Sequence, residues 1–471
     1  MIRDDFRALR GKAFMKKTLF ALFLTGVLVF SVYGRTARRS KTTSKEIIAK
    51  VVSGVKDGKI AYKLTTRKEL EELIGRSIRE ESRNSGGMEM LTVIYQGVTA
   101  EFSRMRNYSA PFTLTKIKAK RWLDIGQKRE IVLRNEGDLK KFDEFWGLAG
   151  ISLENLDLSG QSRFLRKMTF DSRTKWPAED KLPRRYNPAA LLEEGKTPGL
   201  GVRGLHEAGI DGRGIGIAII DQPLLEDHEE YAERLVKYQS VEVRRKHPPQ
   251  MHGSPVVSIA VGKKCGVAPG AFVHYYAVPM WKWDKNCKPW ANIINQIIRD
   301  NAKLEDGKKI RVVSISLGTF SRSINVRSWE RAIAKANKHG ILVVTCDDAF
   351  LDYGTLQRIE GKSADDAKNY RRARRSSKRD IIHVPTSNRS VASHHGRDVY
   401  TYERDGGLSW AAPYLAGVAA LGFQVYPELE PERIVELWLE TASQTRAGSV
   451  INPAAFIEAV KKQRDSVTAT E

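Results

Sequence analysis

The second half of the chain alternates two kinds of segment, and this alternation restricts the folds that it can adopt. Short runs rich in Val and Ile (GIGIAIID, AFVHYYAV, IRVVSISLG and GILVVTC) come between amphipathic segments that end in Gly, such as WERAIAKANKHG. Apolar runs of this length are typical of strands that are buried on both faces, and Gly is the usual helix C-cap. We therefore expect an α/β fold with a mostly parallel sheet, whose functional residues gather at the carboxyl ends of the strands.

The first 180 residues have a different composition. The segment MKKTLFALFLTGVLVFSVYG places two lysines before an apolar stretch, as an export signal does. The stretch is short for a membrane span, although an uncleaved anchor stays open. We interpret residues 1–34 as a signal-peptide region, 35–180 as an N-terminal region with a linker, and 181–471 as the main domain. The role of residues 35–180, a pro-segment or an accessory domain, stays open.

Local patterns in this N-terminal region predict a smaller α+β structure. Strands are predicted at 91–102 and 129–135, and helices at 67–81 and 136–148. The sequence LENLDLSG has one turn of a leucine-rich pattern but no period, so we expect no solenoid. We find no candidate site residue here.

Three polar residues in the second half stand where such a fold exposes chemical groups. Asp221 ends the run GIGIAIID, where a buried acid is costly unless it is paired, or it caps the following turn. His252 opens the small-residue segment HGSPVVSIAV, either on the surface or toward a cleft. Ser409 opens a run of small apolar residues, GGLSWAAPYLAGVAALGFQV, at helical spacing. Its hydroxyl would lie beside the unpaired N–H groups at the positive end of that helix, although packing alone also explains the small residues.

Together these segments resemble the active-site motifs of the subtilisin-like serine peptidases. IAIIDQP resembles the aspartate motif, HGSPVVSIAVG with GVAPGA the histidine motif, and GGLSWAAPYLAGVAAL the serine motif, in the order that the family uses. The resemblance covers about residues 190–465 and implies the subtilisin-like three-layer α/β fold. It also implies an endopeptidase in which Ser409 attacks a peptide carbonyl, His252 accepts the proton, and Asp221 orients the imidazole.

The resemblance extends to substrate binding but departs at the oxyanion hole. VVSISLG resembles the edge segment that receives an extended substrate, so Ser316, Leu317 and Gly318 are expected to pair with its backbone. Where the family usually supplies an asparagine, this chain reads VVTCDDAF, which places Asp347 or Asp348 near that position. A carboxylate there would repel the developing charge, and losing one donor costs about 10²–10³ in rate. A catalytically impaired domain that serves in binding is therefore the alternative.

The net charge restricts the classes of binding partner, and the cysteine content restricts the disulfides. The formal net charge is +23, but no nucleic-acid motif accompanies it, so no nucleic acid is expected. A protein or peptide substrate is expected, and contact with an acidic surface or the cell envelope is open. The expected location is outside the cytoplasm: secreted, periplasmic or envelope-associated.

Three cysteines are too few for a disulfide framework, although Cys265 and Cys287 could pair. Structural calcium is common in the family, but we assign no ligand cluster and no cofactor.

Overall fold

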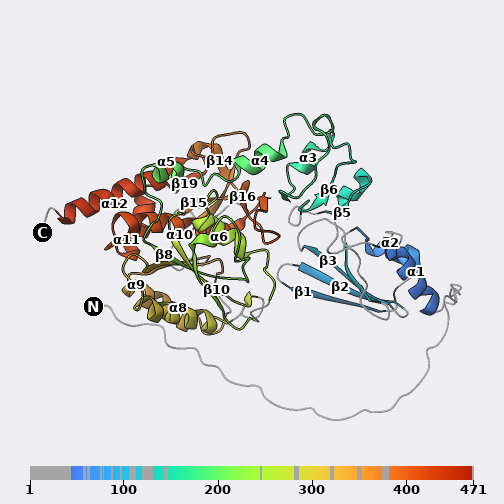
Figure 1. Cartoon of the computed structure of the whole chain (residues 1–471), viewed down its shortest axis with the longest axis horizontal. Coiled ribbons are helices and arrows are strands. Elements are labelled where there is room, and N and C mark those ends of the chain that lie inside the picture. The colour runs from blue at the N-terminus through green and yellow to red at the C-terminus, as the bar shows by residue number, and fades with distance from the viewer. Residues whose placement is uncertain are drawn as a thin grey trace, which may run out of the picture. The chain divides into compact units, whose positions relative to one another are not determined.

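Figure 1 shows a computed structural model of the chain. It describes residues 44–56, 60, 64–74, 77, 79–85, 88–95, 98–105, 113–118, 131–142, 147–243, 247–280, 286–318, 323–346, 353–373 and 381–468. The predicted signal region 1–34 lies outside the described residues, as do Asp347 and Asp348.

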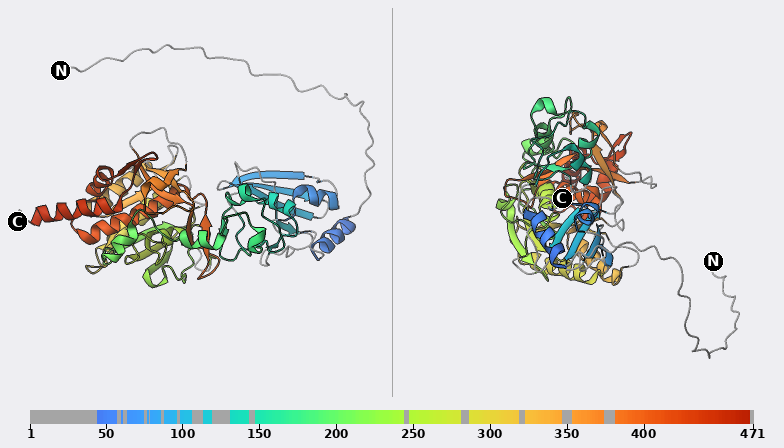
Figure 2. Two further views of the ribbon diagram at one scale, coloured as in Figure 1. Left: turned by 90° about the horizontal axis from the view of Figure 1, so that it is seen from above. Right: turned by 90° about the vertical axis from the view of Figure 1, so that its right-hand side faces the viewer.

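An N-terminal α+β unit has its own hydrophobic core. Helices α1 (Ser44–Lys56) and α2 (Arg67–Ile74) accompany a four-stranded antiparallel sheet, whose strands lie side by side in the order β1-β2-β3-β4 (blue in Figure 2). The strands are β1 (Arg79–Ser85), β2 (Met88–Tyr95), β3 (Val98–Met105) and β4 (Thr113–Lys118).

Two expectations for this unit need correction. The single strand predicted at 91–102 is two strands, β2 and β3, which pair with each other. The helix predicted at 67–81 ends at Ile74, and the residues from Arg79 onward pair with β2 instead. Sheet pairing along β2 has overridden the helical pattern of a charged stretch whose own propensity is weak.

Residues 131–187, called the leucine-rich segment below, form a small parallel stack. Strand β5 (Ile131–Val132) pairs in parallel with β6 (Ile151–Ser152), and Ser152 forms a parallel bridge with Lys175. The leucines of these turns share one core: Leu133, Leu139, Leu148, Leu153, Leu156, Leu158 and Leu165. The sequence LENLDLSG follows β6 and supplies Leu153, Leu156 and Leu158 to this core.

The other elements of the leucine-rich segment are short. They are η1 (Glu136–Lys141), α3 (Ser162–Leu165), β7 (Phe170–Asp171) and η2 (Glu179–Lys181). In the described part of 136–148, the predicted helix is the 3-10 helix η1, which ends before the extended residue Phe142. In the described part of 129–135, the predicted strand is the two residues of β5.

The α/β domain is built on a five-stranded parallel sheet of order β12-β11-β8-β10-β9. Its strands are β8 (Gly216–Asp221), β9 (Leu235–Ser240), β10 (Phe272–Ala277), β11 (Ile310–Ile315) and β12 (Leu342–Thr345). Successive side chains of β8 enter different cores, because side chains alternate along a strand. Ile217 and Ile219 belong to one core, and Ala218 and Ile220 to the other. Burial on both faces explains why β8 reads as a continuous apolar run.

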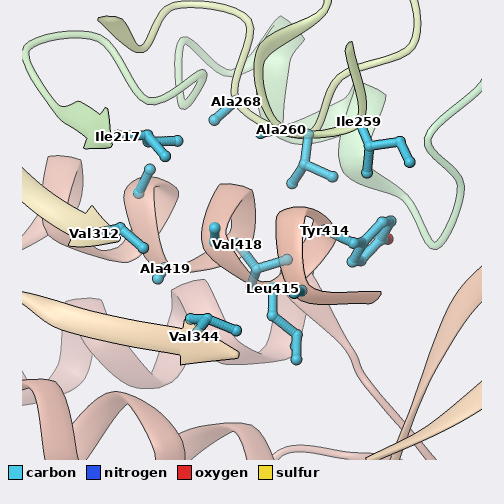
Figure 3. Packing of buried hydrophobic residues seen from close by; sticks show 14 of the residues in the cluster. Ile217, Ile259, Ala260, Ala268, Val312, Val344, Tyr414, Leu415, Val418 and Ala419 are labelled. Carbon is cyan, nitrogen blue, oxygen red and sulfur yellow. The ribbon is translucent and has the colours of Figure 1, made fainter. Parts of the chain in front are cut away.

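Helices cover both faces of this sheet. The core on one face includes residues of α6 (Gly253–Val261) and α10 (Gly407–Val425), and the core on the other includes α8 (Lys288–Asn301) and α9 (Val326–Lys338). Figure 3 shows Val418 and Ala419 of α10 packed beside Ile217, Val312 and Val344 of the sheet. The expected three-layer α/β fold with a mostly parallel sheet and a smaller N-terminal α+β region is confirmed.

Helix α10 runs through the domain core. Every residue from Trp410 to Phe423 is buried, and a Cβ on Gly417 would lie 2.6 Å from the Cβ of Val267. Within the described residues, α10 is the one helix long and apolar enough to cross a membrane, but 78% of its apolar window is buried inside the protein. Its small residues therefore serve close packing of a core helix.

The remaining elements complete the domain. A second sheet has the order β14-β13-β15-β19-β18, and a three-stranded sheet joins β16 and β17 to β7 of the leucine-rich segment. The strands are β13 (Tyr353–Arg358), β14 (Tyr370–Arg372), β15 (Ile382–Ser387), β16 (Arg389–Ala392), β17 (Tyr400–Glu403), β18 (Ser443–Thr445) and β19 (Gly448–Val450). The helices are α4 (Pro188–Glu194), α5 (Val202–Glu207), η3 (Ala232–Arg234), η4 (Ala367–Asn369), α11 (Pro431–Glu440) and α12 (Pro453–Thr468).

Candidate active site

Asp221 is the last residue of the central strand β8, and its side chain is fully buried. One carboxylate oxygen, Oδ1, accepts hydrogen bonds from the backbone N–H of Gln222 (2.7 Å) and from Nδ1 of His252 (2.8 Å). The other oxygen, Oδ2, has no hydrogen-bond partner among the described residues. A buried carboxylate needs such partners to stay ionised, so its pairing with His252 accounts for an acid at this position.

His252 immediately precedes α6, and its side chain is 14% exposed. The next residue, Gly253, allows the helix to begin close to the end of β8. A Cβ on Gly253 would lie 2.6 Å from the hydroxyl of Tyr275 and 2.8 Å from the carbonyl oxygen of Gln222. The glycine of the HGS sequence is therefore required by the approach that brings His252 to Asp221.

The environment of His252 raises the pKa of its imidazole above the ordinary value. Burial alone would lower this pKa, but the charge of Asp221 and the hydrogen bond to it outweigh burial, and the carboxylate of Glu403 contributes in the same direction. Because Nδ1 donates to Asp221, the neutral ring presents Nε2 as its basic nitrogen.

Ser409 lies in the first turn of α10 and is half-buried. The next residue, Trp410, packs against His252 with the ring centroids 5.1 Å apart, which places the serine turn beside the histidine. Gly406 makes room for this packing, because a Cβ there would lie 2.2 Å from Cδ1 of Trp410. Among the described residues, no hydrogen bond joins Ser409 Oγ to the His252 ring.

The predicted substrate segment is linked to the same turn. Ser316, Leu317 and Gly318 follow the end of β11, so they lie at the carboxyl edge of the parallel sheet like Asp221. Ser316 Oγ donates to the backbone oxygen of Ser409 at 2.7 Å. The backbone oxygen of Leu317 accepts from the N–H of Cys346 at 3.1 Å, which directs that carbonyl into the protein.

The structure adds two residues that sequence reasoning missed. Trp410 is 4% exposed, and its indole N–H has no hydrogen-bond partner among the described residues. The sequence could have indicated Trp410 as a site residue, because it directly follows Ser409. Burial raises the pKa of Glu403 to about 7, with Asp405 adding to the effect and Thr169 and His252 opposing it. Glu403 gave no sequence signal, because its location depends on how β17 pairs with β7 and β16.

The described residues contain neither a candidate metal centre nor a disulfide between Cys265 and Cys287. Within the described residues, no set of three or more His, Cys, Asp or Glu side chains is arranged to hold a metal ion. In the same part of the chain, no disulfide joins Cys265 to Cys287, so the pairing left open by the sequence is not formed.

Comparison with known proteins identifies the family of the α/β domain. Residues 212–347, which include Asp221 and His252, match the model of the subtilase family, peptidase family S8. By this match the α/β domain is a member of the subtilase family. The predicted family is thereby confirmed.

Relatives of this subtilase are distant. The subtilisin-like protease PopC of Myxococcus xanthus (strain DK1622) is 25% identical over 311 residues, which cover 55% of this chain and 62% of PopC. Fervidolysin from Fervidobacterium pennivorans, a keratinolytic enzyme related to subtilisin, is 18% identical, with 56% of this chain and 45% of that chain covered and a TM-score of 0.43. A structure from the subtilase cytotoxin SubAB assembly is 15% identical, with coverages of 56% and 97% and a TM-score of 0.43.

Proposed function

We propose that this subtilase is a serine endopeptidase that hydrolyses peptide bonds through Asp221, His252 and Ser409. The observation that carries the proposal is the hydrogen bond of 2.8 Å from His252 Nδ1 to the buried carboxylate of Asp221. It leaves Nε2 as the free base, in a ring that also contacts the residue after Ser409.

The reaction follows from these positions. Ser409 Oγ attacks the carbonyl carbon of the peptide, and His252 Nε2 takes the hydroxyl proton as the new C–O bond forms. The peptide C–N bond then breaks as the same proton passes to the departing amine, which leaves an acyl ester on Ser409. Water, which gives a proton to His252, attacks this ester, and the C–O bond to Ser409 breaks as the proton returns to its hydroxyl and the acid is released. Asp221 stabilises the imidazolium during both steps without being protonated. The missing Ser409–His252 hydrogen bond is compatible with this role, because such bonds are often long in the free enzyme and tighten with substrate.

The negative charge that develops on the carbonyl oxygen needs hydrogen-bond donors. The backbone N–H of Ser409 lies in the first turn of α10, where N–H groups have no partner within the helix. Asp347 and Asp348, the candidates for a second position, lie outside the described residues. We further propose export of the protein, supported by the lysines and apolar stretch of residues 15–34.

The test is labelling of the purified chain with a fluorophosphonate, beside the variant Ser409→Ala. We expect covalent labelling of Ser409 in the parent protein and none in the variant, with a fall in peptide hydrolysis of about 10⁶-fold. Ser449, a serine on β19, is a matched control position for Ser449→Ala, which should label normally. A parent protein that folds but does not label would instead support the catalytically impaired alternative.

A further inference from the structure

Arg404 is a charged residue buried close to the candidate nucleophile. It follows the last residue of β17, lies five positions before Ser409, and is 4% exposed. Its guanidinium forms an ion pair with Glu360. Two further contacts go to the leucine-rich segment: Nε donates to the backbone oxygen of Met168 (3.2 Å), and Nη2 donates to that of Leu165 (3.3 Å). Nη1 also donates to Asn388 Oδ1 at 3.5 Å, and the guanidinium lies over the Tyr402 ring.

Residues 165–171, called the docking strand below, hold β17 by its backbone as well. Phe170 and Asp171 pair antiparallel with Tyr402 and Thr401. The Phe170 ring stacks on Tyr402 with the centroids 5.2 Å apart. Tyr402 is fully buried and is a member of the leucine core rather than of the α/β core. A strand of the α/β domain therefore completes its packing only when the docking strand is present.

The backbone of Arg404 contacts the docking strand shortly before the helix that carries Ser409. The backbone N–H of Arg404 donates to Thr169 Oγ1 (3.3 Å), and α10 begins at Gly407, with only two residues in between. Gly406 is fixed next, because its N–H donates to Ser387 Oγ (3.4 Å) and a Cβ there would clash with Trp410. The backbone from Arg404 to Ser409 thus has little freedom to adjust if Arg404 moves.

On the other side of the same strand end, Glu403 connects the docking strand to the histidine. Thr169 Oγ1 lies 3.5 Å from Glu403 Oε2, at the limit of a hydrogen bond, and Glu403 interacts electrostatically with His252. Thr169 is 4% exposed and Glu403 is half-buried, so this contact is partly shielded from water.

We propose that the docking strand is a permanent part of the enzyme rather than a removable leader, and that Arg404 is the positioning residue through which it holds the turn carrying Ser409. Loss of the docking strand would leave the Arg404 guanidinium without two carbonyl acceptors and would uncover Tyr402. The first change removes two hydrogen bonds of the charged group, and the second exposes a large apolar ring to water, so both are unfavourable. The catalytic part of this inference rests on the proposed function, whereas the structural part does not.

The test compares full-length Arg404→Met with Arg433→Met. Arg433, on α11, is also ion-paired, but its partners are Glu436, Glu440 and Gln463. In Arg404→Met we expect kcat to fall about 10- to 100-fold with KM changed less than about twofold, because a misplaced nucleophile loses rate more than binding. We also expect faster amide hydrogen exchange at residues 405–410, a readout that needs no activity. The control should change neither.

A second, milder variant keeps the inference testable if Arg404→Met misfolds, and a mass measurement asks whether the docking strand is retained. Thr169→Val keeps the charge of Arg404, and we expect it to show the same changes to a smaller degree. The active enzyme purified after any self-processing should still contain residues 165–171 by mass spectrometry. Unchanged kcat and exchange in both variants, or an active chain that starts beyond residue 171, would overturn the inference. A parent protein without labelling or hydrolysis would refute the proposed function alone, since the exchange measurement would still test the positioning.

Discussion

The α/β domain core and the leucine-rich segment are stabilised in different ways. In the domain core, whole strands such as β8 are buried on both faces, and α10 contributes fourteen consecutive buried residues from Trp410 to Phe423. In the leucine-rich segment, strands of two residues are stacked, and single contacts such as Arg404 to Leu165 and Met168 join it to the domain. Both regions make hydrogen bonds to the residues that precede Ser409, although only the first region contains the motifs.

The change expected to separate the two regions most sharply is Asp221→Asn. It should leave both cores folded, because the two side chains have nearly the same shape, but lower kcat by about 10⁴-fold by favouring the wrong tautomer of His252. The acid limb of the kcat/KM profile should also move to lower pH, since the carboxylate that raises the pKa of His252 is gone. Steady-state rates from pH 5 to 9 measure both effects. An unchanged rate would remove Asp221 from the mechanism.

The next prediction compares one glycine from each region. Gly147 of the leucine-rich segment has φ +53°, and a Cβ there would lie 1.9 Å from the Thr169 backbone oxygen. Gly147→Ala should therefore lower the free energy of unfolding by about 2–4 kcal/mol. Gly417→Ala, in α10, should cost about 1–3 kcal/mol, because its clash is with the Val267 side chain and helical Ala offsets part of it.

Urea unfolding in the Ser409→Ala background measures both values without self-digestion. Hydrogen exchange should show that Gly147→Ala loosens the docking strand first, whereas Gly417→Ala affects the domain core. Equal costs with identical exchange patterns would mean that the two regions unfold as one unit and that the distinction between them is wrong.

The smallest effect is expected for Glu403→Gln, at the junction of the two regions. Because the folded-state pKa of Glu403 is raised to about 7, the folded protein retains a proton that the unfolded chain has lost between about pH 4.5 and 7. Wild-type stability should therefore fall as pH rises through this window, and the glutamine variant should be spared about 1–3 kcal/mol of that loss. Unfolding at pH 5 and pH 8 tests this. If the wild type and the variant lose the same stability between these pH values, Glu403 titrates as it would in water, and its assignment to the junction is wrong.

Sequence reasoning succeeded where a residue's environment follows from its immediate neighbours. The strand that ends at Asp221, the helix that opens after His252 and the long helix of Ser409 all have continuous apolar runs, and the structure contains each of them. It failed where distant segments decide the outcome. The stretch 67–81 carries a helical pattern but contributes to a sheet after Ile74, because β2 offers a pairing partner.

The sequence by itself determined the α/β fold, the family and the three residues proposed for catalysis. In these motifs, the small and apolar residues next to each group determine whether it is exposed or buried. Only the tertiary structure decided what surrounds those residues. Three features depend on segments that are distant in the chain: the contact of Trp410 with His252, the raised pKa of Glu403, and the hydrogen bonds from Arg404 to the docking strand. Such contacts arise from chain crossings and close backbone approach, and no local pattern of residue types encodes them.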